Sequence, residues 1–157
     1  MRNMVVLLTG LLMAVCLAGC AGASGPASSG GTAGGPQGEQ AEAVADQEFG
    51  LLAAGDWPGA WRLWTDSAQR VLTETAFVKL NTECRPQLGV PYVIWQAQRT
   101  GTTTVLVRWT RGPAKGSNAM RYQQGAWKFA PSAADLAGYR RGVGRLVARL
   151  KAEQACH

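Results

Sequence analysis

The chain has 157 residues, of which 16 are lysine or arginine and 10 are aspartate or glutamate, giving a formal net charge of +6. Its single histidine is the last residue, which excludes catalysis by an internal histidine base. The sequence also lacks the G-x-S-x-G, H-E-x-x-H, Walker A and G-x-G-x-x-G motifs, which mark several large classes of hydrolase and nucleotide-binding enzyme.

The first residues have the pattern of an export signal. Arg2 gives a positive start, and residues 4–18 form an apolar run of 15 residues, which suits a signal peptide and is short for a membrane-spanning helix. The run ends in Leu-Ala-Gly-Cys at residues 17–20, which resembles the lipobox of bacterial lipoproteins of the Gram-positive, actinomycete type. This resemblance implies a signal peptide over residues 1–19 and a diacylglyceryl anchor on Cys20. A plain secretion signal with a chance cysteine is the alternative.

An uncharged segment follows the predicted lipidation site. Residues 21–38 contain seven glycines, four alanines and three serines, so they cannot bury enough apolar surface to offset the entropy lost on ordering. We expect residues 20–38 to be a flexible tether that spans roughly 24 Å. It would hold one folded domain, residues 39–157, at the extracytoplasmic face of the cell membrane.

Helices are predicted in the first half of this domain. Apolar residues recur at helical spacing over residues 39–54, with Glu42, Asp46 and Glu48 largely away from the apolar face, and Gly55 is a typical helix end. A short helix should follow Asp56, which is a suitable N-cap, and Thr73 should cap a further helix that runs to about Cys84. Tryptophans recur at i, i+4 and i+7 in the short helix and should share one face: Trp57, Trp61 and Trp64.

The pattern changes to strands over residues 90–130, which are rich in β-branched and aromatic residues. Strands are predicted over residues 90–100 and 102–111, with a turn at Thr100-Gly101, and a loop is predicted over residues 112–118. Residues 117–124 and 125–130 should then form two strands around Gln124-Gly125 or one bent strand. Alternation in the second strand places three residues on one face: Val105, Val107 and Trp109.

A basic helix is predicted after Pro131. Ser132 and Asp135 have the spacing of a capping box, and the apolar stripe continues to Leu150. The helix carries five cations: Arg140, Arg141, Arg145, Arg149 and Lys151. Two alternatives remain open, because the apolar stripe could pack on the domain or the helix could lie on anionic head groups.

The cysteines divide by position. Cys16 belongs to the predicted signal peptide and Cys20 to the lipid anchor, which leaves Cys84 and Cys156 as a pair in a compartment where disulfides persist. A bond between them would stabilise the domain by roughly 4 kcal/mol through loop closure. Two free thiols are the alternative. No metal site is expected, since only His157 could join them.

The order of elements suggests a family. Helices followed by antiparallel strands, with LLAAGDWPGAWRLWTDSAQ near the start and QQGAWKF near the end, resemble the NTF2-like (nuclear transport factor 2-like) superfamily over residues 41–131. That resemblance implies an α+β cone, in which N-terminal helices pack on a strongly curved antiparallel sheet. The C-terminal basic helix departs from the family pattern. Such domains include enzymes, ligand binders and noncatalytic modules, so the resemblance fixes no activity.

Seven aromatic residues could line the cone as a cavity for an apolar or aromatic ligand, or simply fill the core: Trp57, Trp61, Trp64, Phe77, Trp109, Tyr122 and Trp127.

We expect a noncatalytic binding or interaction module of the cell envelope, with a small-ligand binder as the alternative. An enzyme ranks third, and its conceivable acid–base residues form no recognisable motif: Asp46, Asp66, Tyr92, Tyr122 and Tyr139.

Charge is distributed unevenly along the domain. Residues 39–84 contain eight acids and three bases, whereas residues 85–157 contain two acids and twelve bases. This asymmetry could give a basic face toward phospholipid head groups or anionic wall polymers, or merely separate acids and bases between two halves of the fold. Neither a nucleic-acid partner nor a cofactor is expected.

Overall fold

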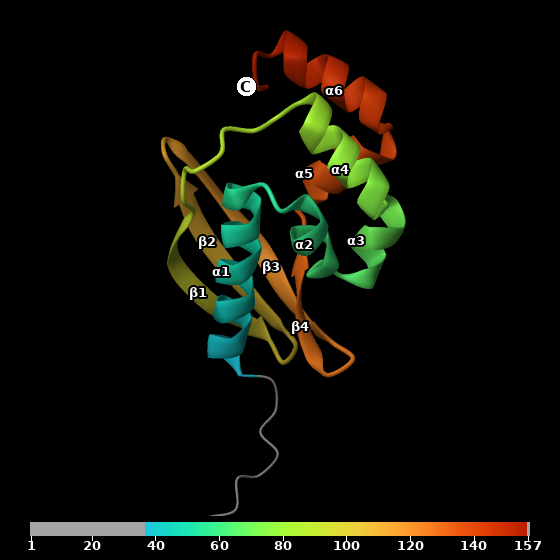
Figure 1. The fold of residues 1–157 in the computed structure, drawn as a ribbon. Coiled ribbons are helices and arrows are strands. Elements are labelled where there is room, and N and C mark those ends of the chain that lie inside the picture. The colour runs from blue at the N-terminus through green and yellow to red at the C-terminus, as the bar shows by residue number, and fades with distance from the viewer. Residues whose placement is uncertain (1–36, 157) are drawn as a thin grey trace, which may run out of the picture. The chain divides into compact units, whose positions relative to one another are not determined.

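The computed structural model describes residues 37–156, so the predicted signal peptide, Cys20 and nearly all of the predicted tether lie outside the described residues. Helices pack against a four-stranded antiparallel open sheet (Figure 1), which confirms the α+β fold class. In chain order the elements are α1 (Gly38–Ala54), α2 (Trp57–Arg62), α3 (Asp66–Val71), α4 (Glu74–Glu83), β1 (Val93–Gly101), β2 (Thr104–Arg111), β3 (Ala114–Gln123), β4 (Ala126–Ala130), α5 (Ala133–Arg140) and α6 (Val143–Ala152).

The helix ends follow the capping residues in the sequence. Gly55 adopts a left-handed conformation with φ of 82° and ends α1, as predicted. The Asp56 carboxylate accepts a hydrogen bond from the Gly59 amide at 2.9 Å, and Thr73 caps α4 through the Ala76 amide at 3.3 Å. The Ser132–Asp135 capping box at the start of α5 is also present.

The sheet presents one buried face to α1. The strand order is β1-β2-β3-β4, and the buried inner face carries residues from three strands: Val105, Val107, Met120, Trp127 and Phe129. Ala41, Ala45 and Phe49 of α1 belong to the same core. The core therefore lies between this helix and the sheet, and Figure 1 shows α1 in front of the strands.

Two details of the predicted sheet are wrong. The first turn lies at residues 102–103 rather than at Thr100-Gly101, because Gly101 pairs with Thr104. The predicted loop over residues 112–118 is mostly strand, since Ala114 already pairs with Arg111 across a two-residue turn. Gly112 allows that short connection because its φ is 55°.

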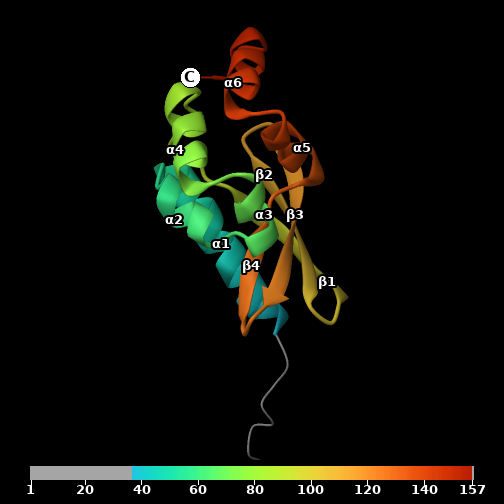
Figure 2. The ribbon, with the colours of Figure 1, turned by 90° about the vertical axis from the view of Figure 1, so that its right-hand side faces the viewer.

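The predicted single C-terminal helix is also wrong, because the chain forms two helices, α5 and α6. They separate at Gly142, whose φ of 95° lies outside the helical region and is accessible to glycine. After this break α6 lies beside α4 (Figure 2). Leu146 and Val147 of α6 form a buried cluster with Leu80 and Cys84.

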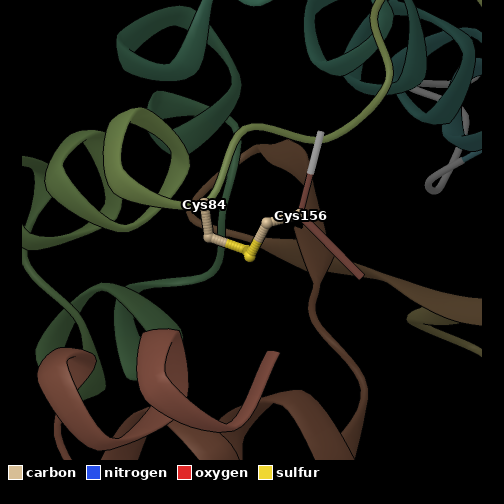
Figure 3. Close-up of a disulfide and its surroundings, with 2 residues drawn as sticks. All are labelled: Cys84 and Cys156. Carbon is tan, nitrogen blue, oxygen red and sulfur yellow. A yellow bond between two sulfur atoms is a disulfide. The ribbon is translucent and has the colours of Figure 1, made fainter. Parts of the chain in front are cut away.

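A disulfide joins Cys84, at the end of α4, to Cys156, with an S–S distance of 1.96 Å (Figure 3). The predicted pairing is confirmed. The bond ties Cys156, which follows α6, to the end of α4. The helix α6 is therefore held by this bond as well as by its buried cluster with α4. None of the helices formed by residues 37–156 is long and apolar enough to cross a membrane.

A candidate ligand cavity around Glu48

A cavity of about 270 Å³ lies between α1, the helices that follow it and the inner face of the sheet. Eight of its 16 lining residues are aromatic, and seven of these come from α1, α2, α4, the sheet and the segments that join them: Phe49, Trp57, Trp64, Phe77, Tyr92, Trp109 and Phe129. Tyr139 of α5 also lines it. Aromatic walls with a few polar groups are typical of small-molecule sites.

Glu48 is a fully buried carboxyl group in the lining of this cavity. It lies on the buried face of α1, at helical spacing from Ala41 and Ala45, and its exposed fraction is 0%. Trp64 Nε1 donates a hydrogen bond to Glu48 Oε1 at 2.9 Å, whereas the buried Oε2 has no partner within the described part of the chain. Burial raises the pKa of Glu48 to about 8, although the hydrogen bond from Trp64 acts to lower it. The carboxyl group is therefore mostly protonated at neutral pH.

The position of Trp64 depends on the edge of the sheet. The segment around it pairs with the free edge of β4, since the Phe129 amide donates to Leu63 O at 2.7 Å and the Thr65 amide donates to Phe129 O at 2.9 Å. These bonds leave Trp64 2% exposed. Its ring also stacks on Tyr139 with centroids 5.9 Å apart. The indole N–H is thereby directed to Glu48.

Arg111 lies at the rim of the cavity and is bound to the segment before β1. Its guanidinium lies over the Tyr92 ring at 4.7 Å, and Nη1 donates to Tyr92 Oη at 3.2 Å. It also donates to the carbonyl oxygens of Val90 and Gln87. Tyr92 in turn stacks on Phe49 at 4.6 Å. Arg111 is therefore held by hydrogen bonds to Gln87, Val90 and Tyr92, and it forms no ion pair with Glu48 in the described part of the chain.

The two tyrosines of the cavity remain neutral. Burial raises the pKa of Tyr92, and Arg111 partly offsets this effect. Burial also raises the pKa of Tyr139, with smaller contributions from the negative charges of Asp135 and Glu48. Asp135 is exposed at the start of α5, where its carboxylate accepts hydrogen bonds from Ser132. It is the second carboxyl group that lines the cavity.

Trp109 is held against β3 by a close approach that requires glycine. A Cβ atom on Gly116 would lie 2.3 Å from Trp109 Cζ2, closer than side chains tolerate. Trp109 Nε1 donates to Asn118 Oδ1 at 2.8 Å, and Asn118 Nδ2 donates to Ala130 O at 3.2 Å. These contacts fix one wall of the cavity on rigid strands.

The seven predicted lining residues divide into two groups. Four of them line the cavity: Trp57, Trp64, Phe77 and Trp109. Trp61 instead donates to Leu72 O at 2.7 Å, between α2 and the end of α3. Tyr122 and Trp127 stack edge to face with each other near the β3–β4 turn, because the inner face of the sheet extends beyond the cavity.

Sequence reasoning did not place Glu48 or Asp135 in the cavity, and its interpretation that Glu48 lies largely away from the apolar face of the first helix is wrong, because Glu48 is fully buried. Glu48 carries one signal that was available, because an acid at spacing 3 and 7 from Ala45 and Ala41 lies on the apolar face of its helix. Among the residues considered for acid–base chemistry, Tyr92 and Tyr139 line the cavity. Asp46, Asp66 and Tyr122 do not line it.

The five predicted surface cations are all exposed: Arg140, Arg141, Arg145, Arg149 and Lys151. Arg149 forms an ion pair with Glu153 at 3.9 Å. Trp95 of β1 is 57% exposed, and the guanidinium of Arg108 on the neighbouring strand β2 lies 5.9 Å from the centroid of its ring. The sequence contains no acidic residue between Glu83 and Asp135.

Neither protein-family models, nor curated proteins, nor solved structures match this chain in the comparisons made. Between residues 37 and 156, no group of three or more histidine, cysteine, aspartate or glutamate side chains gathers where it could hold a metal ion.

Proposed function

We propose that this chain is a bacterial lipoprotein whose extracytoplasmic, NTF2-like domain binds a small molecule in the cavity around Glu48. The observation that carries the proposal is the buried Oε2 of Glu48, which lacks a partner inside an aromatic-walled cavity. Native proteins rarely leave a buried polar atom unsatisfied, because the loss of hydration is costly. A polar group of a bound ligand would supply the missing partner.

The size of the cavity limits the ligand. A volume of about 270 Å³ lies just below the usual range of about 300–1,000 Å³ for ligand sites, so it suits a compound with a single ring or a short chain. The aromatic walls favour an apolar body, and Glu48 favours one polar group.

The helices and sheet also support an NTF2-like domain. Helices precede an antiparallel sheet, α1 packs on the inner face of the sheet, and the cavity opens between them.

The chain enters α1 at the end of the domain opposite to α6 (Figure 1). Because α6 buries its apolar side against α4 and is followed by the disulfide, we propose that it packs on the domain rather than on a membrane.

Cys20→Ala should release the protein from membranes. The thiol of Cys20 is the acceptor of the proposed diacylglyceryl group, and stable anchoring depends on acyl chains. Fractionation of cells that express the two forms measures the effect, with the wild-type chain expected in the membrane pellet and the variant in the soluble fraction. A Cys16→Ala variant is the control and should remain in the pellet. Continued sedimentation of Cys20→Ala with membranes would contradict the anchor.

The mature chain should retain a small molecule when it is purified gently without reductant. Native mass spectrometry of residues 20–157 carrying Cys20→Ser would detect an additional mass that is lost under denaturing conditions. Its mass and fragments would identify the chemical class of the ligand. A protein that is ligand-free, and that binds no small compound in solution, would overturn the cavity proposal.

The second candidate is an interaction module for an acidic protein surface of the cell envelope. The outer face of the sheet favours it, since Trp95 and Val93 are more than half exposed beside Arg108. The strand β1 is a free edge of the sheet, and the segment from residue 84 to residue 134 carries only positive charges. Catalysis ranks third, because Glu48 is hydrogen-bonded to Trp64 rather than to either tyrosine of the cavity.

A further inference from the structure

We infer that the ligand group bound by Glu48 is a protonated amine, so that the cavity takes a small organic monocation with an apolar body. This inference rests on the proposed function and names the ligand class of the same site. It begins from the distribution of charge in the cavity.

The cavity lining contains two carboxyl groups and no free cation placed to pair with Glu48 when it ionises. Glu48 and Asp135 line it, and Arg111 is the one positive side chain in the lining. Arg111 is engaged at the rim by Tyr92 and by two backbone carbonyls. A buried carboxylate needs a paired charge and additional hydrogen bonds. An ammonium group supplies both, because it carries a positive charge and several N–H donors toward Oε2.

The walls favour a cation as well. Aromatic faces attract a positive charge within about 6 Å through the quadrupole of the ring, and this attraction strengthens when the cation is desolvated. Eight aromatic residues line the same cavity as Glu48: Phe49, Trp57, Trp64, Phe77, Tyr92, Trp109, Phe129 and Tyr139. A ligand with a neutral carbonyl group would accept a hydrogen bond from the protonated Glu48 carboxyl, but it would gain little from the aromatic rings of the cavity. An anion would find no free positive charge beside Glu48, because Arg111 is engaged by Tyr92 and by two backbone carbonyls.

Binding of an amine should release a proton. The free carboxyl group is mostly protonated at neutral pH, so the ammonium pairs with Glu48 after the Oε2 proton has passed to solvent. Affinity should therefore rise with pH up to about 8 and then level off. The other groups that face Glu48 are Tyr92, Tyr139, Asp135 and Arg111. Burial raises the pKa of both tyrosines and keeps them neutral over this range.

The test compares two probes of the same shape, 2-phenylethylamine and 2-phenylethanol, on residues 20–157 carrying Cys20→Ser. Calorimetry should show that the amine binds at least about tenfold more tightly than the alcohol at about pH 8. Its affinity should rise by nearly tenfold per pH unit between about pH 6 and pH 7, with release of close to one proton.

Glu48→Gln separates charge from shape. Glutamine keeps an oxygen that accepts from Trp64 Nε1 and cannot ionise, so the variant should lose at least about tenfold in amine affinity while its circular dichroism stays unchanged. Glu42→Gln, which changes an exposed acid on the same helix, is the matched control and should bind the amine normally. If Glu48→Gln fails to fold, the pH dependence of amine affinity in the protein that keeps Glu48 provides the same test.

The inference is overturned by equal binding of amine and alcohol, by normal amine binding by Glu48→Gln, or by an affinity that does not rise with pH. If the alcohol binds in these cases, the cavity function stands and the amine does not. No binding of the amine up to about 10 mM also overturns the inference. The co-purification experiment then decides separately whether the cavity binds another class of molecule.

Discussion

Glu48→Gln is expected to flatten the pH dependence of the domain's stability between about pH 5 and pH 8. The pKa of Glu48 rises from the ordinary value of 4.5 to about 8 in the folded protein, so the folded state keeps a proton that the unfolded chain has already lost. The stability linked to this proton is fully present below pH 4.5 and is lost as pH rises toward 8. The loss is on the order of 5 kcal/mol. Glutamine at this position never ionises, so its contribution should not change with pH.

Urea unfolding of both proteins from about pH 5 to about pH 9 measures the effect. The two stability curves should diverge with rising pH, and Glu48→Gln should be the more stable protein above about pH 8. Glu42→Gln removes the same charge from an exposed position of α1 and should follow the wild-type curve. Parallel curves for wild type and Glu48→Gln would show that Glu48 ionises in the folded protein much as it does in the unfolded chain.

Local signals predicted most of the fold. Gly55, Asp56 and Thr73 mark helix ends through contacts with their immediate neighbours, and alternation assigned the inner face of β2 correctly. The errors arose where tertiary contacts decide. Gly142 breaks the C-terminal helix because α6 turns to pack on α4, and the apolar periodicity continues through the break without revealing it.

The candidate site was harder to predict than the fold. Helical spacing places the side chain of Glu48 on the buried face of α1, but only the packed structure shows that Trp64 bonds one of its oxygens and leaves the other free. The bonding of the Leu63–Thr65 segment to β4 creates that contact, and it joins residues 64 positions or more apart in sequence. The same lack of long-range information explains why Trp61, Tyr122 and Trp127 were grouped with the cavity, since composition cannot separate one region of an aromatic core from another.

Reduction of the Cys84–Cys156 disulfide is expected to lower the free energy of unfolding by about 2–4 kcal/mol. The bond spans 72 positions of sequence, a segment that contains all four strands and both C-terminal helices. Crosslinking so long a loop lowers the entropy of the unfolded chain, although part of the theoretical gain is often not realised. For a domain of this length the melting temperature should fall by about 8–15 °C. Thermal unfolding with and without reductant measures the change.

The double variant Cys84→Ala, Cys156→Ala separates the crosslink from other effects of reductant. It should melt near the temperature of the reduced protein and should not respond to reductant. Loss of the bond also removes the crosslink between the end of α4 and the residues after α6. The small cluster of Leu80, Leu146 and Val147 then holds α6 against α4. Because this cluster is far smaller than the main core, we expect protease cleavage to begin in α6 after reduction, before the domain unfolds. An unchanged melt with both thiols shown to be free would mean that packing alone holds α6, and the disulfide would then contribute little to stability.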